Sequence, residues 1–552
     1  MVKIASKFQT IYKETGLNIE EDLLYVRLNL DAPHVSSPLL VKKGEETYLL
    51  VRDGERGNFD GEQIPATVLY FNTYEKFNDD DGELPRDWVE IVREIACGDE
   101  VEVDDELHVG AVFRMSEAFP LMVNSTSVIS QLFSYQVDTE TVKKAFSACY
   151  GTGLQDARKL VSGLEQKERI LKLLDGGVSS GERFSYLDTI VHDLKLDAIL
   201  LSSPLNVQEV TGLPYEYLKT HEVIAVYSPG MPVNVISYSS LDFPHLQLNR
   251  IHKNVREAVA AWRIHQKITI GIEEDHLPYR YALELGLGRG NLIPVGEKLR
   301  YWREFRAPED LPFYLVAAQA TISGINETLK YAEELITTER EFTETEIQRH
   351  LYENFARFLA KNELRVRIVP YFIVLHAGQR TTYPNKPSFD VLKSSDTKSL
   401  RLDCGVFVID ERGLLRATSD LCRTLTLQPE AKELYTYLAR LMISRAVPAI
   451  MPGKRGADIY REGVREMFSS DQTRWIAKGL LPESGLTRYR RHIGHVMGKQ
   501  EPSTVVFEEG NEGVLKNGMV CCLEYHWLRG HYAIGVEDMF LVTSEGAVNI
   551  TH

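Results

Sequence analysis

The stretch RLDCGVFVIDERGLLRATSDLCRT, residues 401–424, decides the interpretation of the last third of the chain. Two apolar runs flank the polar segment DERG, a pattern typical of a β-hairpin. If Glu411 and Arg412 are the two central loop residues, Asp403 and Asp420 lie directly opposite each other. Opposed Cβ atoms are about 5 Å apart, so the two carboxylates repel each other unless a cation lies between them. The hairpin therefore predicts a metal site; an exposed hairpin with two solvated Asp side chains is the alternative.

The last hairpin of the chain repeats this arrangement in the stretch NGMVCCLEYHWLRGHYAIGVEDMFLVT, residues 517–543. Gly530 and His531 suit a two-residue turn, because a type II′ turn has Gly at its first central position. That turn places Glu524 directly opposite Glu537. A second pair of carboxylates is thus predicted to face across a hairpin.

Between the two hairpins lies the stretch YRRHIGHVMGKQ, which carries His492 and His495. Two Asp, two Glu and one His side chain suit two Mn, Zn, Fe or Co ions, because these ions accept oxygen and imidazole ligands. Two such ions about 3.5–4 Å apart, bridged by carboxylates, would neutralise the facing acids. The predicted cofactors are therefore two divalent metal ions.

The composition narrows the function classes. The chain has 552 residues and a net charge of −16 at pH 7, which argues against nucleic acid as a partner. No window is apolar enough for a transmembrane span, and the start MVKIASKFQT lacks the apolar core of a signal peptide, so we expect no membrane partner. Six cysteines do not make a disulfide framework in a chain of this length. Reduced thiols predict a cytoplasmic protein.

Three regions differ in their secondary-structure pattern. Residues 1–175 mix strand-like runs with a helix at DWVEIVREIA, and the polar segment LLDGGVSSGERF then predicts a linker. Residues 180–305 alternate strands and helices, which predicts an α/β domain. Residues 306–552 hold two long helical patterns followed by strands, hairpins and further helices, which predicts an α+β domain.

The order of the motifs LDCG, SDLCRT, HIGHVMG, GMVCCLEY and GVEDMFLVT resembles the aminopeptidase P, prolidase and creatinase family, the pita-bread metallohydrolases of the M24 type. The stretch LDAILLSSPLNVQEVTGLP is similar to the N-terminal domain of that family. The resemblance implies an α+β pita-bread catalytic domain over residues 306–552, preceded by a creatinase-type α/β domain over residues 180–305. The segment YLLVRDGERG indicates that residues 1–175 are a further copy of this N-terminal domain.

The resemblance also implies a ligand set and a reaction. The metal ligands would be Asp403, Asp420, His495, Glu524 and Glu537, all of which the chain retains. The implied mechanism is metal-assisted hydrolysis, in which the ions activate a water and Glu524 carries its proton to the leaving group. The implied partner is a small-molecule or short-peptide substrate. Members of the family are often dimers, so we expect a homodimer.

Other positions depart from the family pattern. Members of the family have three histidines around the site, where this chain has Asn385, Arg491 and Pro502. They commonly have an arginine two residues before the last Glu, where this chain has Gly535. Because these family groups bind substrate and stabilise charge during amide cleavage, their absence argues against ordinary Xaa-Pro hydrolysis.

Nearby residues are candidates to replace the missing groups. His526 follows Glu524 by two residues, so the two side chains share one strand face. His492 lies beside the position of a missing histidine, and we take His526 and His492, with Glu524, as the candidate catalytic residues. His376 and Tyr383 lie in the altered segment that ends at Asn385. For each histidine the alternative is simple packing or a hydrogen bond to the backbone.

Three further residues near the ligands each have two possible roles. Cys422 and Cys522 share strand faces with predicted ligands, as small buried apolar residues or as soft metal ligands. Arg423 either supports the ligand shell or forms a structural ion pair. His531 is expected to be solvated in its turn.

Three functions remain open from the sequence. The first is a dinuclear metal-dependent hydrolase or lyase acting on a small or atypical substrate, with a C–N bond of the amide type as its target. The second is an Xaa-Pro aminopeptidase or dipeptidase. The third is a catalytically silent pita-bread binding module, against which the five retained ligands argue, because a cluster of four acids is costly to bury.

Overall fold

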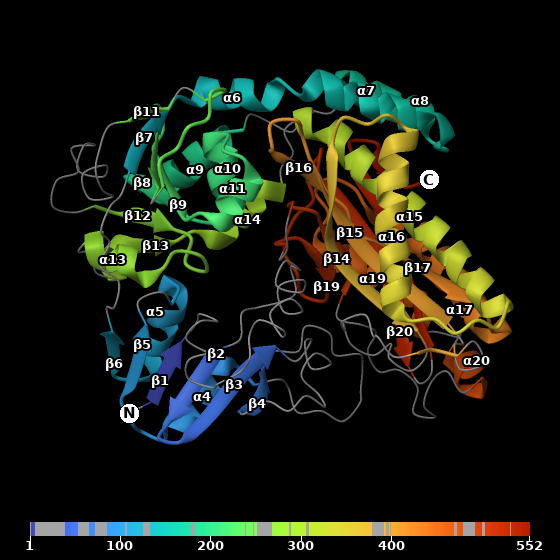
Figure 1. Cartoon of the computed structure of the whole chain (residues 1–552), viewed down its shortest axis with the longest axis horizontal. Helices are drawn as coiled ribbons and strands as arrows, with labels where there is room; N and C mark the ends of the chain where they lie inside the picture. The colour runs from blue at the N-terminus through green and yellow to red at the C-terminus, as the bar shows by residue number, and fades with distance from the viewer. Residues whose placement is uncertain are drawn as a thin grey trace.

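In the computed structural model, the described residues form four β-sheets in three bodies, shown in Figure 1. The first body is coloured blue, the second teal to green, and the third yellow to red. The structure describes residues 2–5, 39–52, 66–71, 86–104, 107–124, 133–177, 183–237, 239–246, 248–250, 268–285, 289–304, 308–377, 391–393, 397, 399–468, 472–478, 492–499, 503–529 and 532–552.

The first body is a six-stranded sheet with the order β4-β3-β2-β1-β5-β6 and two helices. Helix α4 begins where the sequence predicted it, because the Asp87 side chain accepts a hydrogen bond from the backbone N–H of Val89 at 2.8 Å. Its apolar face packs on the sheet. The elements are β1 (Val2–Ala5), β2 (Leu39–Lys43), β3 (Glu46–Arg52), β4 (Thr67–Phe71), α4 (Trp88–Ala96), β5 (Val101–Asp104), α5 (Val109–Ala118) and β6 (Leu121–Asn124).

The second body is a mixed seven-stranded sheet with the order β11-β7-β10-β9-β8-β12-β13. Strands β8, β12 and β13 are parallel, and the others pair antiparallel. The elements are β7 (Phe133–Val137), α6 (Thr139–Ser147), α9 (Ser185–Asp193), β8 (Ala198–Leu201), α10 (Pro204–Thr211), α11 (Tyr215–Thr220), β9 (Val223–Tyr227), β10 (Val233–Ser237), β11 (Asn249–Arg250), β12 (Ile270–Ile272), α13 (Tyr279–Leu285), β13 (Leu292–Pro294) and α14 (Gly296–Glu304).

The predicted boundary near residue 175 does not coincide with the sheets. Strand β7 lies before that boundary but pairs with β10 and β11, so it belongs to the second sheet. Helices α7 (Tyr150–Leu160) and α8 (Lys167–Lys172) leave both N-terminal sheets and run along the third body (Figure 1). They do so because their apolar side chains join the core formed around helix α15 (Leu311–Thr337).

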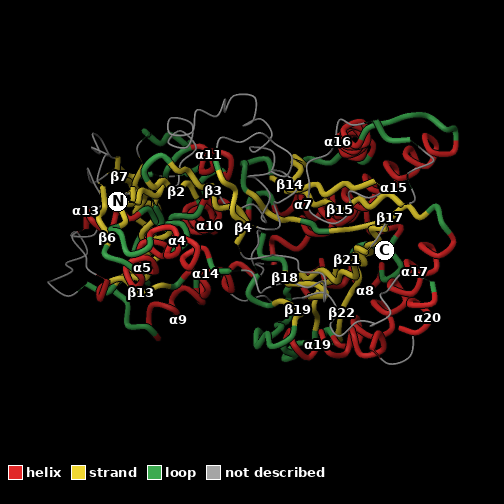
Figure 2. Tube along the Cα trace, turned by 90° about the horizontal axis from the view of Figure 1, so that it is seen from below, coloured by secondary structure: helices red, strands yellow, loops and turns green. Residues whose placement is uncertain are grey.

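The third body consists of two sheets with helices on their outer faces (Figure 2). In one sheet β15 pairs with β14, β16 and β17; the other has the order β19-β18-β20-β21-β22. The strands are β14 (Arg367–Ala377), β15 (Ser399–Ile409), β16 (Leu415–Thr418), β17 (Leu421–Thr426), β18 (His492–Val496), β19 (Val506–Glu508), β20 (Val520–Arg529), β21 (Tyr532–Thr543) and β22 (Gly546–Asn549). The helices are α15, α16 (Glu344–Lys361), α17 (Pro429–Leu441), α18 (Val447–Ala449), α19 (Gly456–Val464) and α20 (Gln472–Ala477).

The two sheets of the third body meet through β17 and β21. The Thr424 hydroxyl bonds to both backbone groups of Gly535, accepting from its N–H at 2.8 Å and donating to its carbonyl at 2.9 Å. Helices α15 and α16 pack on the first sheet, and α17 and α19 on the second. The two predicted long helices are confirmed; α16 is capped by Thr343, whose hydroxyl accepts from the N–H of Glu346.

A buried charge network joins the second body to the third. Lys499 lies 2.6 Å from a carboxylate oxygen of Glu209 and 3.0 Å from one of Asp310. Arg416 contacts the other Asp310 oxygen at 2.7 Å, and Arg183 bonds to Glu209. Glu209 follows β8 in the second body, whereas Lys499 follows β18 in the third, so the network fixes the two bodies together.

Within the part of the chain that the structure describes, no helix has the length and the apolar character needed to cross a membrane.

Candidate metal centre

Side chains of the predicted ligand set converge where the two sheets of the third body face each other. Oxygen atoms of Asp403, Asp420 and Glu537, one from each residue, lie within 4.8 Å of one another. His495 approaches Asp420, with its Nε2 atom 3.5 Å from Oδ2. Glu524 lies on β20, directly opposite Glu537 on β21. All five side chains are buried, with exposed fractions between 1% and 6%.

The pairing of the first hairpin differs from the prediction. Asp403 lies opposite Cys422, not Asp420, because the loop is longer than two residues. The N–H of Asp410 bonds to the carbonyl of Leu414 at 3.0 Å, and Gly413 adopts a φ of +81° that favours glycine. This three-residue loop shifts the pairing by one residue, and a β-bulge between Val408 and Ile409 in the pairing with β16 shifts it by one more, so the total shift is two residues. An even shift keeps side chains on the same strand face, so the two Asp carboxylates still converge.

Asp420 lies between β16 and β17, where the chain departs from regular pairing. Gly405 allows this departure, because a Cβ atom at that position would meet the carbonyl oxygen of Ser419 at 2.0 Å. The Ser419 hydroxyl accepts a hydrogen bond from the N–H of Val406 at 2.9 Å, and this bond closes the gap in the ladder. The glycine of the LDCG motif thus has a steric role beside the site.

The second hairpin has the predicted pairing. Glu524 is opposite Glu537, and the ladder continues to Arg529 and Tyr532 on either side of the turn. Both carboxylate oxygens of Glu537 are buried and have no hydrogen-bond partner among the described residues. Burial raises the pKa of the Glu537 carboxyl well above its usual range, and the neighbouring carboxylates, Asp420 foremost, raise it further. None of the described side chains or backbone groups donates a hydrogen bond to this carboxylate, and in this sense it is uncompensated.

His495 is oriented like a metal-binding histidine. Its Nδ1 atom lies 3.3 Å from the carbonyl oxygen of Val496 and 3.4 Å from the hydroxyl of Ser503. Donation from Nδ1 to the carbonyl leaves Nε2 as the free base that faces Asp420. The donor set of four carboxylates and one imidazole fits two divalent cations, and the buried Glu537 needs either such a cation or a bound proton to offset its charge.

The two candidate catalytic histidines lie beside Glu524. His492 Nδ1 is 2.8 Å from one carboxylate oxygen of Glu524, and His526 Nδ1 is 3.5 Å from the other. Both imidazoles are buried. His526 also approaches Asp403, with Nε2 at 3.9 Å from Oδ2. The structure therefore brings both histidines into the carboxylate cluster, within reach of a proton held by Glu524.

Arg401 is a site residue that the sequence reasoning did not identify. Its guanidinium bonds to Asp403 and lies 3.1 Å from Nδ1 of His526. The signal was present, because Arg401 precedes Asp403 by two residues and so shares its strand face. A buried arginine in this position brings a permanent positive charge to the edge of the carboxylate cluster.

The cysteines near the site are buried thiols. The Cys422 sulfur lies within 4.8 Å of ligand atoms of Asp403 and His526, and the Cys522 sulfur has the same relation to Asp420 and His495. Burial raises the pKa of both thiols, that of Cys522 to about 11. In the absence of metal both are protonated at neutral pH, which is the state of a small apolar side chain.

Arg423 forms the structural ion pair that was one of its two predicted roles, and it also contacts the backbone beside a proposed ligand. It forms an ion pair with Asp538 and donates a hydrogen bond to the backbone carbonyl of Glu537. It also lies 2.7 Å from Nε2 of His552. Through the carbonyl contact the ion pair holds the strand that carries Glu537.

Several predicted positions are beyond what the structure describes. Asn385, Tyr383, Arg491, Pro502 and His531 lie outside the described residues, and for His376 only the backbone, in β14, is described. Gly535 lies opposite His526 in the β20–β21 ladder. A Cβ atom at position 535 would meet the Cys422 sulfur at 2.6 Å and the His526 ring at 2.8 Å. The missing side chain at this position therefore makes room for His526.

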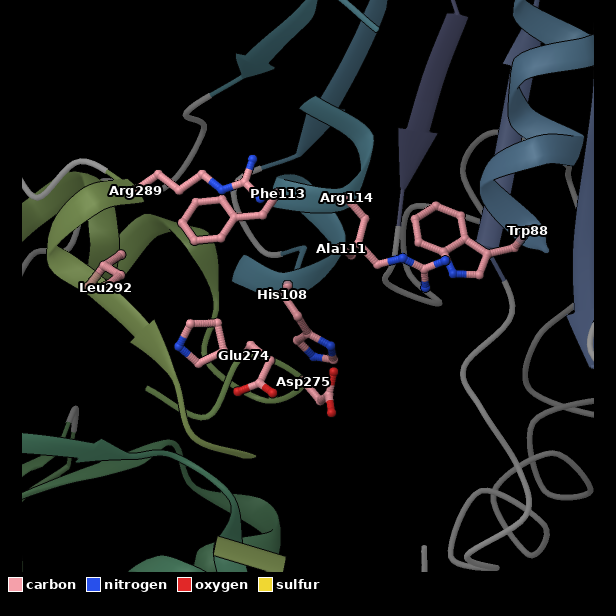
Figure 3. A pocket seen from close by; sticks show the side chains of 11 residues that line it. Trp88, His108, Ala111, Phe113, Arg114, Glu274, Asp275, Arg289 and Leu292 are labelled. Atoms are coloured by element: carbon pink, nitrogen blue, oxygen red, sulfur yellow. The ribbon is translucent and has the colours of Figure 1, made fainter. Parts of the chain in front are cut away.

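A separate cavity of about 530 Å³ lies between the first and second bodies (Figure 3). Aromatic and charged side chains line it, among them Trp88, His108, Phe113, Glu274 and Arg289. Arg289 is paired with Glu117, outside the lining set. None of the predicted metal ligands contributes to this cavity.

Comparison with known proteins places the third body in a family. Residues 315–544 match the model of metallopeptidase family M24. A search of curated proteins found no match.

Solved structures share the fold at low sequence identity. An Xaa-Pro dipeptidase from Bacillus anthracis is 18% identical with a TM-score of 0.51, covering 68% of this chain and 98% of its own. An X-prolyl aminopeptidase from Caenorhabditis elegans, described as a cytosolic enzyme with a di-nuclear active site, is 13% identical with a TM-score of 0.58, covering 93% of this chain and 81% of its own. The N-terminal domain of the FACT complex subunit SPT16 from Cicer arietinum is 15% identical with a TM-score of 0.50. The match covers 73% of this chain and 96% of that domain's chain. These likenesses confirm the predicted fold class, a pita-bread domain preceded by α/β domains.

Proposed function

We propose that the chain is a metal-dependent hydrolase of the peptidase type, because residues 315–544 match the model of metallopeptidase family M24, and on this premise we propose the ligands and the reaction. The proposed ligands of two divalent ions are Asp403, Asp420, His495, Glu524 and Glu537. The proposed reaction is hydrolysis of a C–N bond of the amide type in a small molecule or short peptide.

The observation that carries this proposal is the uncompensated carboxylate of Glu537. It is 1% exposed, faces Glu524 across the hairpin, and has no hydrogen-bond partner among the residues that the structure describes. Burying a charge without a partner costs several kcal/mol, on the order of the stability of a whole domain. Divalent cations bound by the four carboxylates remove this cost, which is why we assign the cluster to metal binding.

When bound, two divalent ions would supply Lewis acidity, activating a water and polarising the substrate carbonyl. The residues of the chain supply proton transfer and orientation. Glu524 is the proposed general base and acid, and His492, 2.8 Å from its carboxylate, is placed to exchange a proton with it. His495 is held by its Nδ1 contacts as a neutral base. The buried position of these side chains limits access of bulk water to them.

We propose a substrate other than ordinary Xaa-Pro peptides. The positions of the family histidines hold Asn385, Arg491 and Pro502, and the position of the family arginine holds Gly535. His526 lies beside Gly535 instead, and Arg401 contacts His526. A site with different polar groups around the same ligands favours a different substrate.

The second candidate function is an Xaa-Pro aminopeptidase. The likeness to the Caenorhabditis elegans protein extends over 93% of this chain, so it includes the N-terminal bodies as well as the third. This likeness concerns the fold alone, so the choice between an aminopeptidase and a dipeptidase is left to the substrate panel.

The deciding experiment combines metal analysis with a substrate panel. Protein purified without chelator is analysed for bound metal, and then loaded separately with Mn, Zn, Fe and Co. Each sample is assayed on Gly-Pro, on Xaa-Pro-Xaa tripeptides, and on small amides and amidines. Two ions for each chain with turnover of a non-prolyl amide would support the proposal. Two ions with turnover of prolyl peptides alone would favour the second candidate, and no bound metal with no turnover would favour a silent binding module.

We also propose a homodimer in a cytoplasmic location. The six cysteines are free thiols, which suits a reducing compartment. Light scattering of the purified protein measures the oligomeric state directly.

A further inference from the structure

Arg401 and His526 form a buried pair at the edge of the carboxylate cluster. Arg401 lies on β15 and His526 on β20, so the contact joins the two sheets of the third body. Arg401 is 4% exposed and His526 is 1% exposed. One guanidinium nitrogen, Nη2, approaches two partners: Oδ2 of Asp403 and, at 3.1 Å, Nδ1 of His526.

The chemistry of the two groups fixes the direction of this hydrogen bond. An arginine is always protonated in a protein, and its nitrogens only donate. The two hydrogens of Nη2 therefore serve Asp403 and His526, and Nδ1 of His526 must accept. A neutral imidazole that accepts at Nδ1 carries its proton at Nε2. A proton on Nδ1 would instead point at the guanidinium N–H.

This tautomer decides what His526 can do. A histidine binds a metal through an unprotonated ring nitrogen, and in His526 one nitrogen accepts from Arg401 while the other carries the proton. We propose that Arg401 is a positioning residue that keeps His526 a hydrogen-bond donor through Nε2–H, and that His526 is not a metal ligand despite its place among the carboxylates. The inference rests on the proposed function, because it assigns the Nε2–H donor to an oxygen of the amide substrate.

The surroundings of His526 favour a donor over a ligand. Its Nδ1 atom lies 3.1 Å from the Arg401 guanidinium and 3.5 Å from an oxygen of Glu524, so the arginine is the nearer partner. Its Nε2 atom lies 3.9 Å from Oδ2 of Asp403, and that oxygen already accepts from Arg401. His495, by contrast, has its Nδ1 beside acceptors, the carbonyl of Val496 and the hydroxyl of Ser503, which leaves Nε2 unprotonated. The inference therefore gives His495 and His526 opposite tautomers: that of His495 is set by acceptors beside Nδ1, and that of His526 by the arginine, the nearest group to its Nδ1.

Gly535 provides the space that this arrangement needs. It lies opposite His526 in the ladder, and a Cβ atom there would lie 2.8 Å from Cδ2 and 3.1 Å from Nε2 of the ring. Any side chain at this position would displace the imidazole. The three residues therefore act together: Gly535 leaves space for the ring, His526 donates a hydrogen bond, and Arg401 fixes which ring nitrogen is the donor.

Donation to a substrate oxygen has a clear use in amide hydrolysis. Negative charge develops on the carbonyl oxygen as the amide is attacked, and a donor held in a dry site stabilises that charge more than water does. Loss of one such donor typically lowers kcat by about 10²–10³-fold. The inferred class of substrate is therefore one with an amide-type carbonyl, whose oxygen reaches the Nε2–H of His526.

The first test counts metal ions without measuring activity. Wild type, His526→Gln and His495→Gln are loaded with cobalt, freed of excess metal, and analysed for cobalt content and for the visible absorption spectrum of the bound ion. We expect His526→Gln to keep the cobalt content and spectrum of the wild type, and His495→Gln to lose about one ion for each chain. Loss of cobalt or a changed spectrum in His526→Gln would make His526 a ligand and overturn the inference.

The second test observes the tautomer. Protein labelled with ¹⁵N in the histidine rings is studied by long-range ¹H–¹⁵N NMR, which distinguishes protonated from unprotonated ring nitrogens; the His526 signals are assigned from their absence in His526→Gln. We expect Nε2–H in the wild type and in Arg401→Lys, where a permanent donor remains, and a loss of this preference in Arg401→Met. Arg367→Met, at a half-exposed arginine of β14 paired with Glu216, is the matched control.

These measurements separate the inference from the proposed function. If the wild type binds no metal, the proposed function fails, whereas the tautomer of His526 still tests the role of Arg401. If two ions bind and His526 carries its proton at Nδ1, the inference fails and the proposed function stands. Should Arg401→Met not fold, the wild-type spectrum and Arg401→Lys still decide the tautomer.

Discussion

Glu524 and Glu537 lie directly opposite each other on β20 and β21, and no described residue donates a hydrogen bond to the carboxylate of Glu537. Asp403 and Asp420 bring two more carboxylates to the same place. Like charges opposed across a ladder destabilise a sheet, and the low dielectric of a buried site strengthens the repulsion. The hairpin that holds the two Glu residues is therefore stable only with compensating charge or with bound protons.

Metal removal should destabilise the protein. Ions that bind the folded chain and not the unfolded chain stabilise it by about 2.7 kcal/mol at one hundred times their Kd. We expect extensive chelation to lower the Tm by several degrees and re-addition of the bound metal to restore it. Calorimetry on samples of verified metal content measures the shift, and an unchanged Tm after complete removal would contradict metal binding at the cluster.

Glu537→Gln should change stability in opposite directions with and without metal. In the metal-free protein the amide removes one of four repelling carboxylates, so we expect a Tm equal to or above that of the wild type. With metal the variant loses a ligand, so we expect a lower Tm than the loaded wild type. Thermal unfolding of the wild type and of Glu537→Gln, each with and without metal, measures whether the sign of the Tm difference reverses. A variant less stable than wild type in both states would mean that Glu537 has a structural partner instead.

The two hairpins show what the sequence could predict. The pairing of Glu524 with Glu537 follows from the position of the turn, and it is confirmed. The pairing of Asp403 with Asp420 is wrong by two residues. Gly413 closes a three-residue loop in place of a two-residue turn, which shifts the pairing by one residue, and a β-bulge between β15 and β16 shifts it by one more. The segment DERG suits either loop, so local chemistry alone does not choose between them. The carboxylates of Asp403 and Asp420 still converge, because a shift of two residues keeps both side chains on the same strand face.

Contacts between sheets could not be predicted in the same way. Arg401 shares a face with Asp403, which the sequence shows, but its contact with His526 depends on how β15 and β20 meet. The steric role of Gly535 depends equally on the ring opposite it and on Cys422 from a third strand. The contacts of Arg401 with His526 and of Gly535 with Cys422 join residues more than a hundred positions apart, where neither periodicity nor turn chemistry gives information. The contact of Gly535 with His526, by contrast, follows from the predicted pairing of the second hairpin.

Glu524→Gln should abolish the native reaction. The amide cannot accept a proton, and general acid–base groups contribute about 10²–10⁴-fold to the rate. We expect kcat to fall by at least that factor, with the circular dichroism spectrum unchanged. Glu433→Gln, on α17 and outside the site, is the matched control and should retain the wild-type rate. Turnover by Glu524→Gln near that of the wild type would assign proton transfer to another residue.

Cleavage of Xaa-Pro peptides should be weak in the metal-loaded enzyme. The chain has Asn385, Arg491 and Pro502 where the family has histidines, and it therefore lacks groups that steady the transition state of prolyl peptide cleavage. We expect kcat/KM for Gly-Pro and for Xaa-Pro-Xaa to be several orders of magnitude below that of an active prolidase assayed in parallel. Comparable turnover by the two enzymes would show that other residues perform the work of the histidines.

Lys499→Met should weaken the contact between the second and third bodies and lower the stability of the protein. Lys499 is buried between Glu209 and Asp310, and removing one partner of a buried ion pair typically costs about 3–5 kcal/mol. Burial alone would raise the pKa of Asp310, but Lys499, Arg416 and Arg183 outweigh it and hold that pKa below its usual range. A depressed carboxyl pKa contributes stability above the ordinary value of about 4, and this contribution is lost as the pH falls below it.

We therefore expect a lower Tm for Lys499→Met at pH 7 and a smaller difference from wild type near pH 3. Calorimetry across this range measures both, with Lys330→Met, at an exposed pair with Glu327, as the control. A difference in Tm that stays constant from pH 7 to pH 3 would show that Lys499 acts through packing and not through its charge.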